Sequence, residues 1–530
     1  MSLVTRARSS GRHRAAGLLV LALVALPVAA DPEVPARRRG SGVLDVRALN
    51  AFVAGEVRRS GLPGLAIGVV DGDRVVDVAG FGRADETGRP VTPETPFLLA
   101  SVSKPLTATA VLQLVDAGRV QLDVPVRRYV PEFRMADSAA ERITVRQLLQ
   151  HTSGIPNTSC DSRQNAATIQ EYVAELRTIH LAAAPGTRHI YCSGNYNLLG
   201  RMVEVVTGES FGGYMQRHVF APLEMRNAFT SAAAGQRAGV ARGHRWLFGV
   251  VRPRDARYDP AQLPSGYLMA SAEDMAHFLV AQQNGGRYRD GQILSPTAVA
   301  AMQEPGVPAG AGGVRYGLGW QQASLGGVPT VQHAGDNYYG HGIAFLQPGT
   351  RRGAVILSNG NGVLPRAAAF ARIEAGVARI LAGQLPLSGL GLRGSYLILD
   401  VALGALLLLA LMPLLRLRRW GRRLRDDRSA GRTRTVRTVI RGGLEIALPV
   451  AVLATARLLL HVLGAQSWAE GLALFPDTGP WLWAVCLVVM VTGVLRLTLA
   501  RTVGRRPAAS EVSEDTASHG GVHRLGAASS

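Results

Sequence analysis

The sequence contains almost no lysine. Of its 58 lysine and arginine residues, only Lys104 is a lysine. Arginine keeps its proton in proteins, whereas a buried lysine can lose it and act as a base. The single lysine is therefore a candidate for acid–base chemistry, with survival by chance as the alternative.

Cysteine is also scarce, with three residues in 530, and no HExxH, CxxC or clustered acidic pattern indicates a metal site. We expect neither a metal nor a cofactor. Cys486 lies in a long apolar run and is interpreted as an apolar filler. Cys160 and Cys192 lie in a part that we expect to be exported, where disulfides persist. They are candidates for a disulfide, with two unpaired thiols as the alternative.

The N-terminus has the pattern of an export signal. Four arginines and no acidic residue precede an apolar run that closes in Val28-Ala29-Ala30. This pattern is typical of a cleaved signal peptide over residues 1–30, followed by a linker over residues 31–42. An uncleaved anchor is the alternative.

The formal net charge of +20 does not indicate nucleic-acid binding, because it divides into +4 over residues 1–30, +8 spread over residues 31–395 and +8 over residues 396–530. Eleven arginines lie between Arg416 and Arg441, which is typical of a loop beside a membrane. Three segments are long enough to span a bilayer: 396–415, 443–464 and 481–500.

The distribution of arginine also predicts the topology. The loop 416–442 and the tail 501–530, which we expect to be disordered, should be cytoplasmic, and the loop 465–480 should be exported. The protein is then a multi-pass membrane protein with its N-terminal domain on the extracytoplasmic side. Glu445, Arg457 and His461 in the second span are interpreted as a polar stripe facing the other helices, or as snorkelling side chains.

Residues 43–385 read as one mixed α and β domain, joined to the first span by a tether over residues 386–395. Strand-like segments occur near both ends, at 64–70, 74–78, 330–333, 342–346 and 353–357, and helical patterns fill the middle. This order predicts an α+β fold in which both ends join one antiparallel sheet flanked by helices, with a helical subdomain to the side.

The only lysine follows a serine at a helical spacing. Ser101 and Lys104 are three residues apart at the start of a helical pattern, so they should share a face within hydrogen-bond reach. A serine hydroxyl becomes a nucleophile when a neighbouring base takes its proton, and a desolvated neutral lysine can do this. The pair predicts nucleophilic catalysis.

The surrounding residues resemble the penicillin-recognising serine hydrolases, which comprise class C β-lactamases, D-Ala-D-Ala carboxypeptidases and related esterases. The resemblance covers about residues 43–382. Its motifs occur in family order: Ser101-Val102-Ser103-Lys104, Leu148-Leu149-Gln150-His151-Thr152-Ser153-Gly154, Pro185-Gly186-Thr187, Tyr191, Tyr196, Pro222-Leu223, Tyr316-Gly317-Leu318-Gly319-Trp320 and His333-Ala334-Gly335.

The resemblance implies a role for each matching residue. Ser101 would be the nucleophile, Lys104 its activating partner, and Tyr191 the base that activates water, provided that Lys104 lowers its pKa. The backbone amides of Ser101 and Asp336 would form the oxyanion hole. Ser193, His333 and Gly335 would contact the substrate, and His151 would be structural.

Two residues depart from the family pattern. The family's Tyr-x-Asn is Tyr191-Cys192-Ser193 here, and a histidine stands where efficient β-lactamases have lysine. Both changes weaken recognition of a carboxylate beside an amide, which favours a peptidase or esterase over a β-lactamase. If His333 binds a substrate carboxylate through its charge, carboxylate-bearing substrates should gain relative to neutral esters as the pH falls from about 8 to about 6.

The sequence thus predicts a membrane-anchored extracytoplasmic serine hydrolase that forms an acyl-enzyme with peptides, esters or β-lactams. A small molecule or peptide would be the substrate, the membrane would be the other partner, and no nucleic acid is expected. The alternative is a sensor that stays acylated and signals through its three helices. An inert binding module is disfavoured because the only lysine falls at the catalytic position.

Overall fold

The computed structural model describes residues 44–157, 166–247, 249–255, 258–310, 312–337, 340–387, 392–429, 435–462 and 478–505. The expected signal peptide and linker, Cys160, and most of the expected exported loop and tail lie outside these residues. The chain divides into two compact units. One comprises residues 1–401 with 460–479, and the other 402–459 with 480–530.

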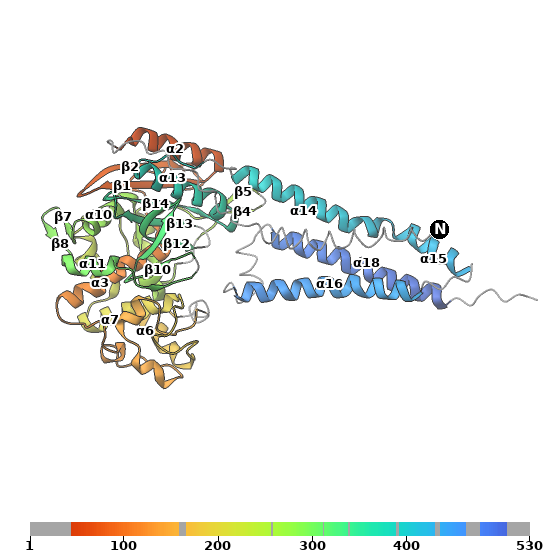
Figure 1. Ribbon diagram of the computed structural model, residues 1–530, viewed down its shortest axis with the longest axis horizontal. Coiled ribbons are helices and arrows are strands. Elements are labelled where there is room, and N and C mark those ends of the chain that lie inside the picture. The colour runs from red at the N-terminus through yellow and green to blue at the C-terminus, as the bar shows by residue number, and fades with distance from the viewer. Residues whose placement is uncertain are drawn as a thin grey trace, which may run out of the picture. The chain divides into compact units, whose positions relative to one another are not determined.

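An eight-stranded sheet forms the centre of the first unit, in the order β2-β1-β14-β13-β12-β11-β10-β9 (Figure 1). Its neighbouring strands are all antiparallel, and β1 from the start of the chain pairs with β14 from the end of the domain. This confirms the expected fold class. The strands are β1 (Gly64–Asp71), β2 (Arg74–Gly82), β9 (Val307–Pro308), β10 (Arg315–Tyr316), β11 (Gln321–Leu325), β12 (Val328–Asn337), β13 (Gly340–Gln347) and β14 (Arg352–Ser358).

The central strands are buried on both faces. Every residue of β13 and all of β1 except Asp71 are buried, which suits the long apolar run of β1. The sheet therefore has a layer on each side. Short strands complete the unit: β3 (Phe97–Leu98), β4 (His244–Leu247), β5 (Val250–Pro253), β6 (Met269–Ala270), β7 (Arg287–Tyr288), β8 (Gly291–Gln292) and β15 (Gly360–Asn361).

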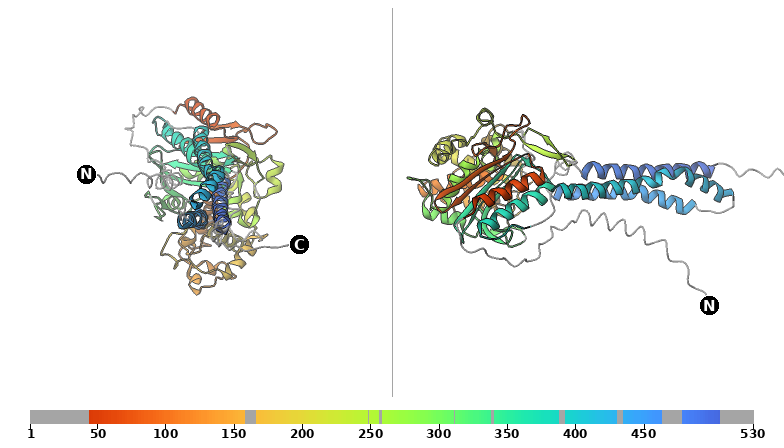
Figure 2. Two further views of the ribbon diagram at one scale, coloured as in Figure 1. Left: turned by 90° about the vertical axis from the view of Figure 1, so that its right-hand side faces the viewer. Right: turned by 90° about the horizontal axis from the view of Figure 1, so that it is seen from above.

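Helices α2 (Val46–Ser60) and α13 (Ala371–Leu381) cover one face of the sheet, side by side (Figure 2). Asp45 caps the N-terminus of α2, and Gly61 ends the helix in the left-handed conformation with φ of 63°. A buried ion pair joins the two helices, with Arg372 Nε 3.0 Å from Glu56 Oε2. The ends of the domain are thus joined through these helices as well as through the sheet.

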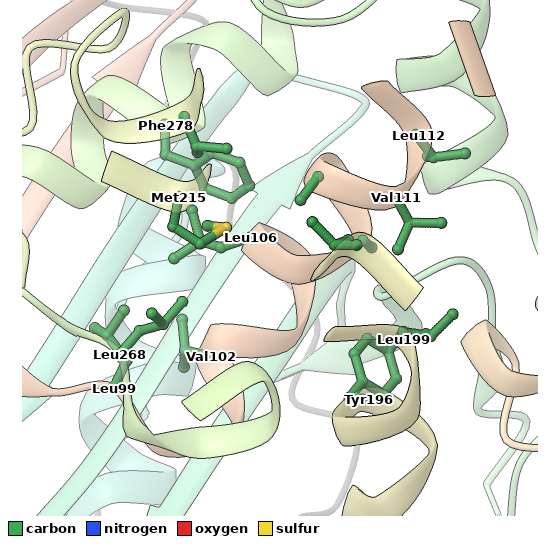
Figure 3. Close-up of a cluster of buried hydrophobic side chains, with 14 of the residues drawn as sticks. Leu99, Val102, Leu106, Val111, Leu112, Tyr196, Leu199, Met215, Leu268 and Phe278 are labelled. Carbon is green, nitrogen blue, oxygen red and sulfur yellow. The ribbon is translucent and has the colours of Figure 1, made fainter. Parts of the chain in front are cut away.

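The other face carries α3 (Ser103–Asp116) and α10 (Ala272–Gln283), with a helical region beyond them. Figure 3 shows Leu106 of α3, Phe278 of α10 and Tyr196 of α7 (Ser193–Thr207) in one buried cluster. Helix α3 is buried on nearly all sides and so lies between the sheet and this region. The further helices are α4 (Val145–Leu149), α6 (Ile169–Glu175), α7 (Ser193–Thr207), α8 (Phe211–Tyr214), α9 (Ala232–Arg237), α11 (Pro296–Gln303) and α12 (Val363–Pro365).

Long apolar helices make up most of the second unit (Figure 1). They are α14 (Leu392–Leu415), α16 (Thr435–Val462) and α18 (Thr478–Arg505), and α14 begins in the first unit. The shorter helix α15 (Leu417–Ser429), between α14 and α16, is rich in arginine. Three stretches are long and apolar enough to cross a membrane: Leu392–Asp426, Val439–Leu458 and Gly479–Val503. Part of the expected arginine-rich loop is helical, because Leu417, Trp420 and Leu424 recur at helical spacing.

Helices α16 and α18 contact each other through small and charged residues. A Cβ on Gly493 would lie 2.9 Å from the carbonyl oxygen of Gly442, so the two backbones approach closely. Arg496 of α18, which is 6% exposed, forms an ion pair with Glu445 of α16. Glu445 therefore faces α18 as the polar stripe predicts, whereas the side chain of His461 lies outside the described residues.

Candidate active site

Ser101 lies in a tight turn at the start of α3. The turn, η1 (Ala100–Val102), precedes the helix, and its alanine has a φ of 48°, a left-handed conformation that is unfavourable for a residue with a side chain. The amide of Leu99 donates a hydrogen bond of 2.9 Å to the carbonyl of Leu268, and Leu99 and Val102 are buried beside it (Figure 3). Buried neighbours thus hold Ser101 partly exposed in a strained turn.

Lys104 lies beneath Ser101 and is fully buried. Its Nζ is 2.9 Å from Ser101 Oγ, 3.3 Å from Ser193 Oγ and 2.8 Å from the carbonyl oxygen of Ser265. Ser265 belongs to a short π-helical turn, η7 (Leu263–Tyr267), and Thr107 of α3 donates a hydrogen bond of 2.6 Å to the preceding carbonyl. The structure confirms the expected contact between Ser101 and Lys104.

Burial lowers the pKa of Lys104 to about 7, so the amine is neutral in a large part of the molecules at neutral pH. A neutral amine has two hydrogens and one lone pair. The Ser265 carbonyl and the Ser193 hydroxyl can accept the two hydrogens, which leaves the lone pair for the proton of Ser101. The three contacts therefore fit lysine as a base.

Tyr191 lies on the other side of the serine. Its hydroxyl donates a hydrogen bond of 2.9 Å to Ser101 Oγ, and Lys104 Nζ lies 5.0 Å from the centre of its ring. Burial raises the pKa of Tyr191, and the nearby carboxylate of Asp336 raises it further. The role of base expected for Tyr191 from the sequence requires that Lys104 lower its pKa. This condition is not met, because the effect of burial on the pKa of Tyr191 outweighs that of its hydrogen bond with Ser101. Tyr191 rests as a hydrogen-bond donor.

The end of β12 reaches the nucleophile from the sheet. Among the described residues, β11 pairs with β12 only as far as Gln332, whereas β13 pairs along β12 to Asn337. One edge of β12 after Gln332 is therefore free of β11 and faces η1. A Cβ on Gly335 would lie 2.5 Å from the carbonyl oxygen of Leu99 and 2.8 Å from the amide nitrogen of Ser101.

A glycine is required at position 335 of β12, because any side chain there would collide with the backbone of the turn that carries Ser101. We expect Gly335→Ala to slow acylation of Ser101 by about 10² or more, because a shift of about 1 Å at a reacting centre costs that much. Gly349→Ala is the matched control, since nothing lies within 4 Å of the position of its Cβ. Acylation rates and melting temperatures of both variants test this, and a Gly335→Ala protein that acylates like the parent would show that β12 does not constrain the turn.

His333 is buried and makes its contacts inside the protein. Its Nε2 lies 2.9 Å from the hydroxyl of Tyr316, and its Nδ1 lies 2.7 Å from the carbonyl oxygen of Ala334. Burial, together with the charge of Lys104, lowers the pKa of His333 to about 3. A charge on His333 near pH 6, the condition for the pH-dependent substrate choice considered above, is therefore not expected in the folded protein, because burial removes the solvent that an imidazolium needs.

The lowered pKa of His333 removes the expected pH dependence of substrate choice. The ratio of kcat/KM for a carboxylate-bearing peptide to that for a neutral ester should stay constant between about pH 8 and about pH 6, since His333 remains neutral throughout. Parallel pH profiles for the two substrates test this. A ratio that rises as the pH falls would contradict this prediction if His333→Lys abolishes the rise. It would show that protonated His333 binds the substrate carboxylate.

The side chain of Asp336 belongs to a charged cluster behind the strand end. His341 of β13 is buried between two carboxylates, with Nδ1 2.9 Å from Asp336 Oδ1 and Nε2 2.5 Å from Glu374 Oε1. Burial alone would lower the pKa of His341, but the two carboxylates raise it overall. Arg366 completes the cluster with Nη1 2.9 Å from Glu374. These contacts fix the strand end that carries Asp336.

Sequence reasoning missed several of these groups. The carbonyl of Ser265 and the cluster of His341, Glu374 and Arg366 have no local sequence signal. Tyr316 was noticed only as part of a motif, yet its hydroxyl also lies 3.2 Å from His151 Nε2.

His151 is buried and makes its contacts inside the protein, and the structural role that the resemblance implies for it stays a prediction. It has a φ of 56°, and its Nδ1 accepts a hydrogen bond of 3.2 Å from the amide of Cys192. Cys192 is buried beside the site, whereas Cys160 lies outside the described residues, so their disulfide stays a prediction.

Known proteins are similar to this chain over most of its length. The Beta-lactamase family model matches residues 49–378. Penicillin-binding protein 4 of Amycolatopsis lactamdurans is 32% identical over 320 residues, which are 56% of this chain and 81% of that protein.

Two solved structures share the fold. The octameric penicillin-binding protein homologue from Pyrococcus abyssi is 28% identical with a TM-score of 0.57, covering 64% of this chain and 78% of that one. A D-alanine carboxypeptidase from Burkholderia cenocepacia is 22% identical with a TM-score of 0.52, covering 64% of this chain and 99% of that one, and shows likeness of fold alone. With a family model that matches most of the chain and a serine, a lysine and a tyrosine in contact, the protein belongs to the β-lactamase and penicillin-binding-protein family of serine hydrolases.

Proposed function

We propose that the protein transfers acyl groups from peptides, esters or β-lactams to Ser101 and then to water. The observation that carries this proposal is the position of Ser101 Oγ, which lies 2.9 Å from both Lys104 Nζ and the Tyr191 hydroxyl. One partner can take the proton of the serine, and the other can donate to the same oxygen. This arrangement suits a nucleophile that must lose a proton and later act as a leaving group.

Acylation would begin with the neutral amine of Lys104. As Ser101 Oγ forms a bond to the carbonyl carbon of the substrate, its proton passes to Lys104 Nζ. The bond between that carbon and the leaving nitrogen or oxygen then breaks, and the leaving atom takes a proton through Lys104 or Tyr191. The product is an ester between Ser101 and the acyl group, and the proton count balances.

The negative charge on the substrate oxygen needs donors at a fixed position. We assign these to the backbone amides of Ser101 and Asp336, as the family resemblance implies. The close approach of Gly335 to the amide of Ser101 supports this assignment, because the next residue of the strand is Asp336. Removal of water from this edge would strengthen both hydrogen bonds.

Acylation should therefore depend on pH through Lys104. Its pKa is lowered to about 7 by burial, and only the neutral form accepts a proton. We expect the acylation rate to rise as the pH increases from about 6 to about 8 and to level off above the lysine pKa. Single-turnover acylation by a β-lactam or an ester at several pH values measures this, and a rate that falls across the same range would contradict a neutral lysine.

One observation favours a sensor as the second candidate. Deacylation needs a base for water, and burial raises the pKa of Tyr191, so its hydroxyl is a poor base at rest. A slow deacylation would leave Ser101 acylated for a long time. In this alternative, the acylated domain would signal through the three apolar helices.

Turnover distinguishes the two candidates. A hydrolase releases many product molecules per protein from a D-Ala-D-Ala peptide, a short ester or nitrocefin. A sensor releases one equivalent of leaving group in a burst and then stops. Continuous release supports the hydrolase, and a burst of one equivalent followed by silence supports the sensor.

We also propose that the protein is a multi-pass membrane protein with the catalytic unit on the extracytoplasmic side. The three apolar stretches support membrane insertion by their length and composition. The arginines between residues 416 and 441 support a cytoplasmic position for that segment.

A further inference from the structure

A cavity of about 870 Å³ lies in the first unit, and its lining includes none of the catalytic residues. The C-terminal end of α2, the loop between α2 and β1, the end of β2 with the residues after it, the hairpin of β4 and β5 and the first turn of α14 form its walls. Arg58, Arg83 and Arg393 line it, and all three are exposed. No residue of this cavity has a part in the acyl-transfer chemistry proposed above.

The cavity carries an excess of positive charge. Two carboxylates line it, but each has an arginine partner of its own: Asp85 pairs with Arg89 at 2.9 Å, and Glu86 pairs with Arg242. None of Arg58, Arg83 and Arg393 forms an ion pair within the part of the chain that the structure describes.

The net charge of the cavity stays positive when the ion-pair partners that lie outside its lining are included. Arg242 also pairs with Asp255, so five arginines stand against three carboxylates. His244 adds no charge near neutral pH, because burial lowers its pKa. Three guanidinium groups without carboxylate partners are suited to binding phosphate oxygens, because each presents a planar fork of donors.

Apolar side chains complete the lining. Val57, Leu62, Phe81 and Val251 stand beside the arginines, with Pro63 and Pro253. The volume falls within the range of cavities that hold small organic ligands and is far larger than one phosphate ion requires. A ligand that fills this cavity should therefore carry both an anionic head and an apolar part.

The position of Arg393 in the chain indicates that such a ligand comes from the membrane. It is the second residue of α14, whose apolar stretch starts at Leu392 and is long enough to cross a membrane. The turn that carries Arg393 is fixed to the catalytic unit, because Leu392 and Tyr396 are buried in its core and the guanidinium lies against Gly61. If this helix enters a bilayer, its first turn lies at the level of the lipid headgroups.

We propose that this cavity binds the headgroup of an anionic phospholipid, with the phosphate on Arg58, Arg83 and Arg393 and the glycerol region against the apolar wall. The bound lipid would fix the catalytic unit against the membrane surface. This inference is independent of the reaction at Ser101 and requires only that α14 enters the bilayer.

Native mass spectrometry of the full chain in detergent tests the proposal, with phosphatidylglycerol and phosphatidylcholine as probes. We expect the parent protein to retain phosphatidylglycerol in preference to phosphatidylcholine. The Arg58→Gln/Arg83→Gln/Arg393→Gln variant should lose about tenfold or more in phosphatidylglycerol affinity, the equivalent of one charge-assisted hydrogen bond. Arg47→Gln is the matched control, because Arg47 is an exposed arginine of the same helix outside the cavity.

Each result decides for or against the proposal. Loss of the preference in the triple variant and its retention in the control support it, provided that both proteins melt at the parental temperature. Equal retention of the two lipids by the parent, or an unchanged preference in the triple variant, would overturn it. Displacement of phosphatidylglycerol by excess inorganic phosphate would also overturn it, since the cavity would then be a site for a free anion. Any of these results leaves the proposed chemistry of Ser101 untouched.

Discussion

Ser101→Ala should abolish labelling by a fluorescent penicillin or fluorophosphonate and reduce turnover by about 10⁶-fold, the scale seen when a catalytic serine is lost. The substitution removes the oxygen that Lys104 and Tyr191 both contact, and it leaves the backbone of the turn unchanged. The melting temperature should change little, because the serine is only partly buried.

Ser103→Ala is the matched control for this prediction. Ser103 is the first residue of α3, two residues after Ser101. It is fully buried, and its Oγ has no hydrogen-bond partner among the described residues. This variant should label and turn over like the parent. If Ser101→Ala still labels, or if both variants lose labelling equally, the assignment of the nucleophile is wrong.

Lys104→Arg should reduce acylation by about 10² or more, the usual scale for loss of a general base. Arginine keeps the positive charge but cannot become neutral, so it cannot accept the proton of Ser101. The buried amine has three close partners, and the larger guanidinium cannot occupy the same position. Pre-steady-state acylation rates give the measurement, and melting temperatures show whether the fold is kept.

Lys104→Met separates the role of the charge from that of the base. Methionine fills a similar volume and has no amine. If lysine acts as a neutral base, the arginine and methionine variants should both acylate slowly. If the charge alone matters, the arginine variant should keep the parental rate and only the methionine variant should lose it, and the pH dependence proposed for Lys104 would then have no cause.

Local sequence patterns were sufficient to predict the contact between Ser101 and Lys104. Residues three apart at the start of a helix lie on one face, and this is independent of the rest of the chain. The central strands were also predictable, because long apolar runs such as that of β1 fit a sheet that is buried on both faces. The ends of these elements differ by a few residues, since pairing with neighbours such as β14 extends them.

Properties that depend on burial were not predictable from the sequence. The motif suggests that Tyr191 has a lowered pKa and that His333 titrates near neutral pH. In the folded protein, loss of solvent raises the first pKa and lowers the second. Both pKa shifts depend on how the turn η7, α7 and β12 pack around Lys104. No local sequence pattern predicts this packing.

Contacts between segments that are far apart in the sequence were also not predictable from it. The carbonyl of Ser265 reaches Lys104 across 161 residues of sequence and uses no side chain. Likewise, the pairing of His341 with Asp336 and Glu374 arises where β12, β13 and α13 meet. A charged residue is easy to find in a sequence, but its partner is known only once the fold is known.

Mapping the site of acylation tests the central claim most directly. The full chain is incubated with a β-lactam or an activated ester and quenched in acid, and the intact mass and the labelled peptide are then measured. The account predicts one acyl group per chain, attached to Ser101, with faster formation at pH 8 than at pH 6. An adduct on any other residue, or hydrolysis without an adduct on Ser101 at any time after mixing, would contradict it.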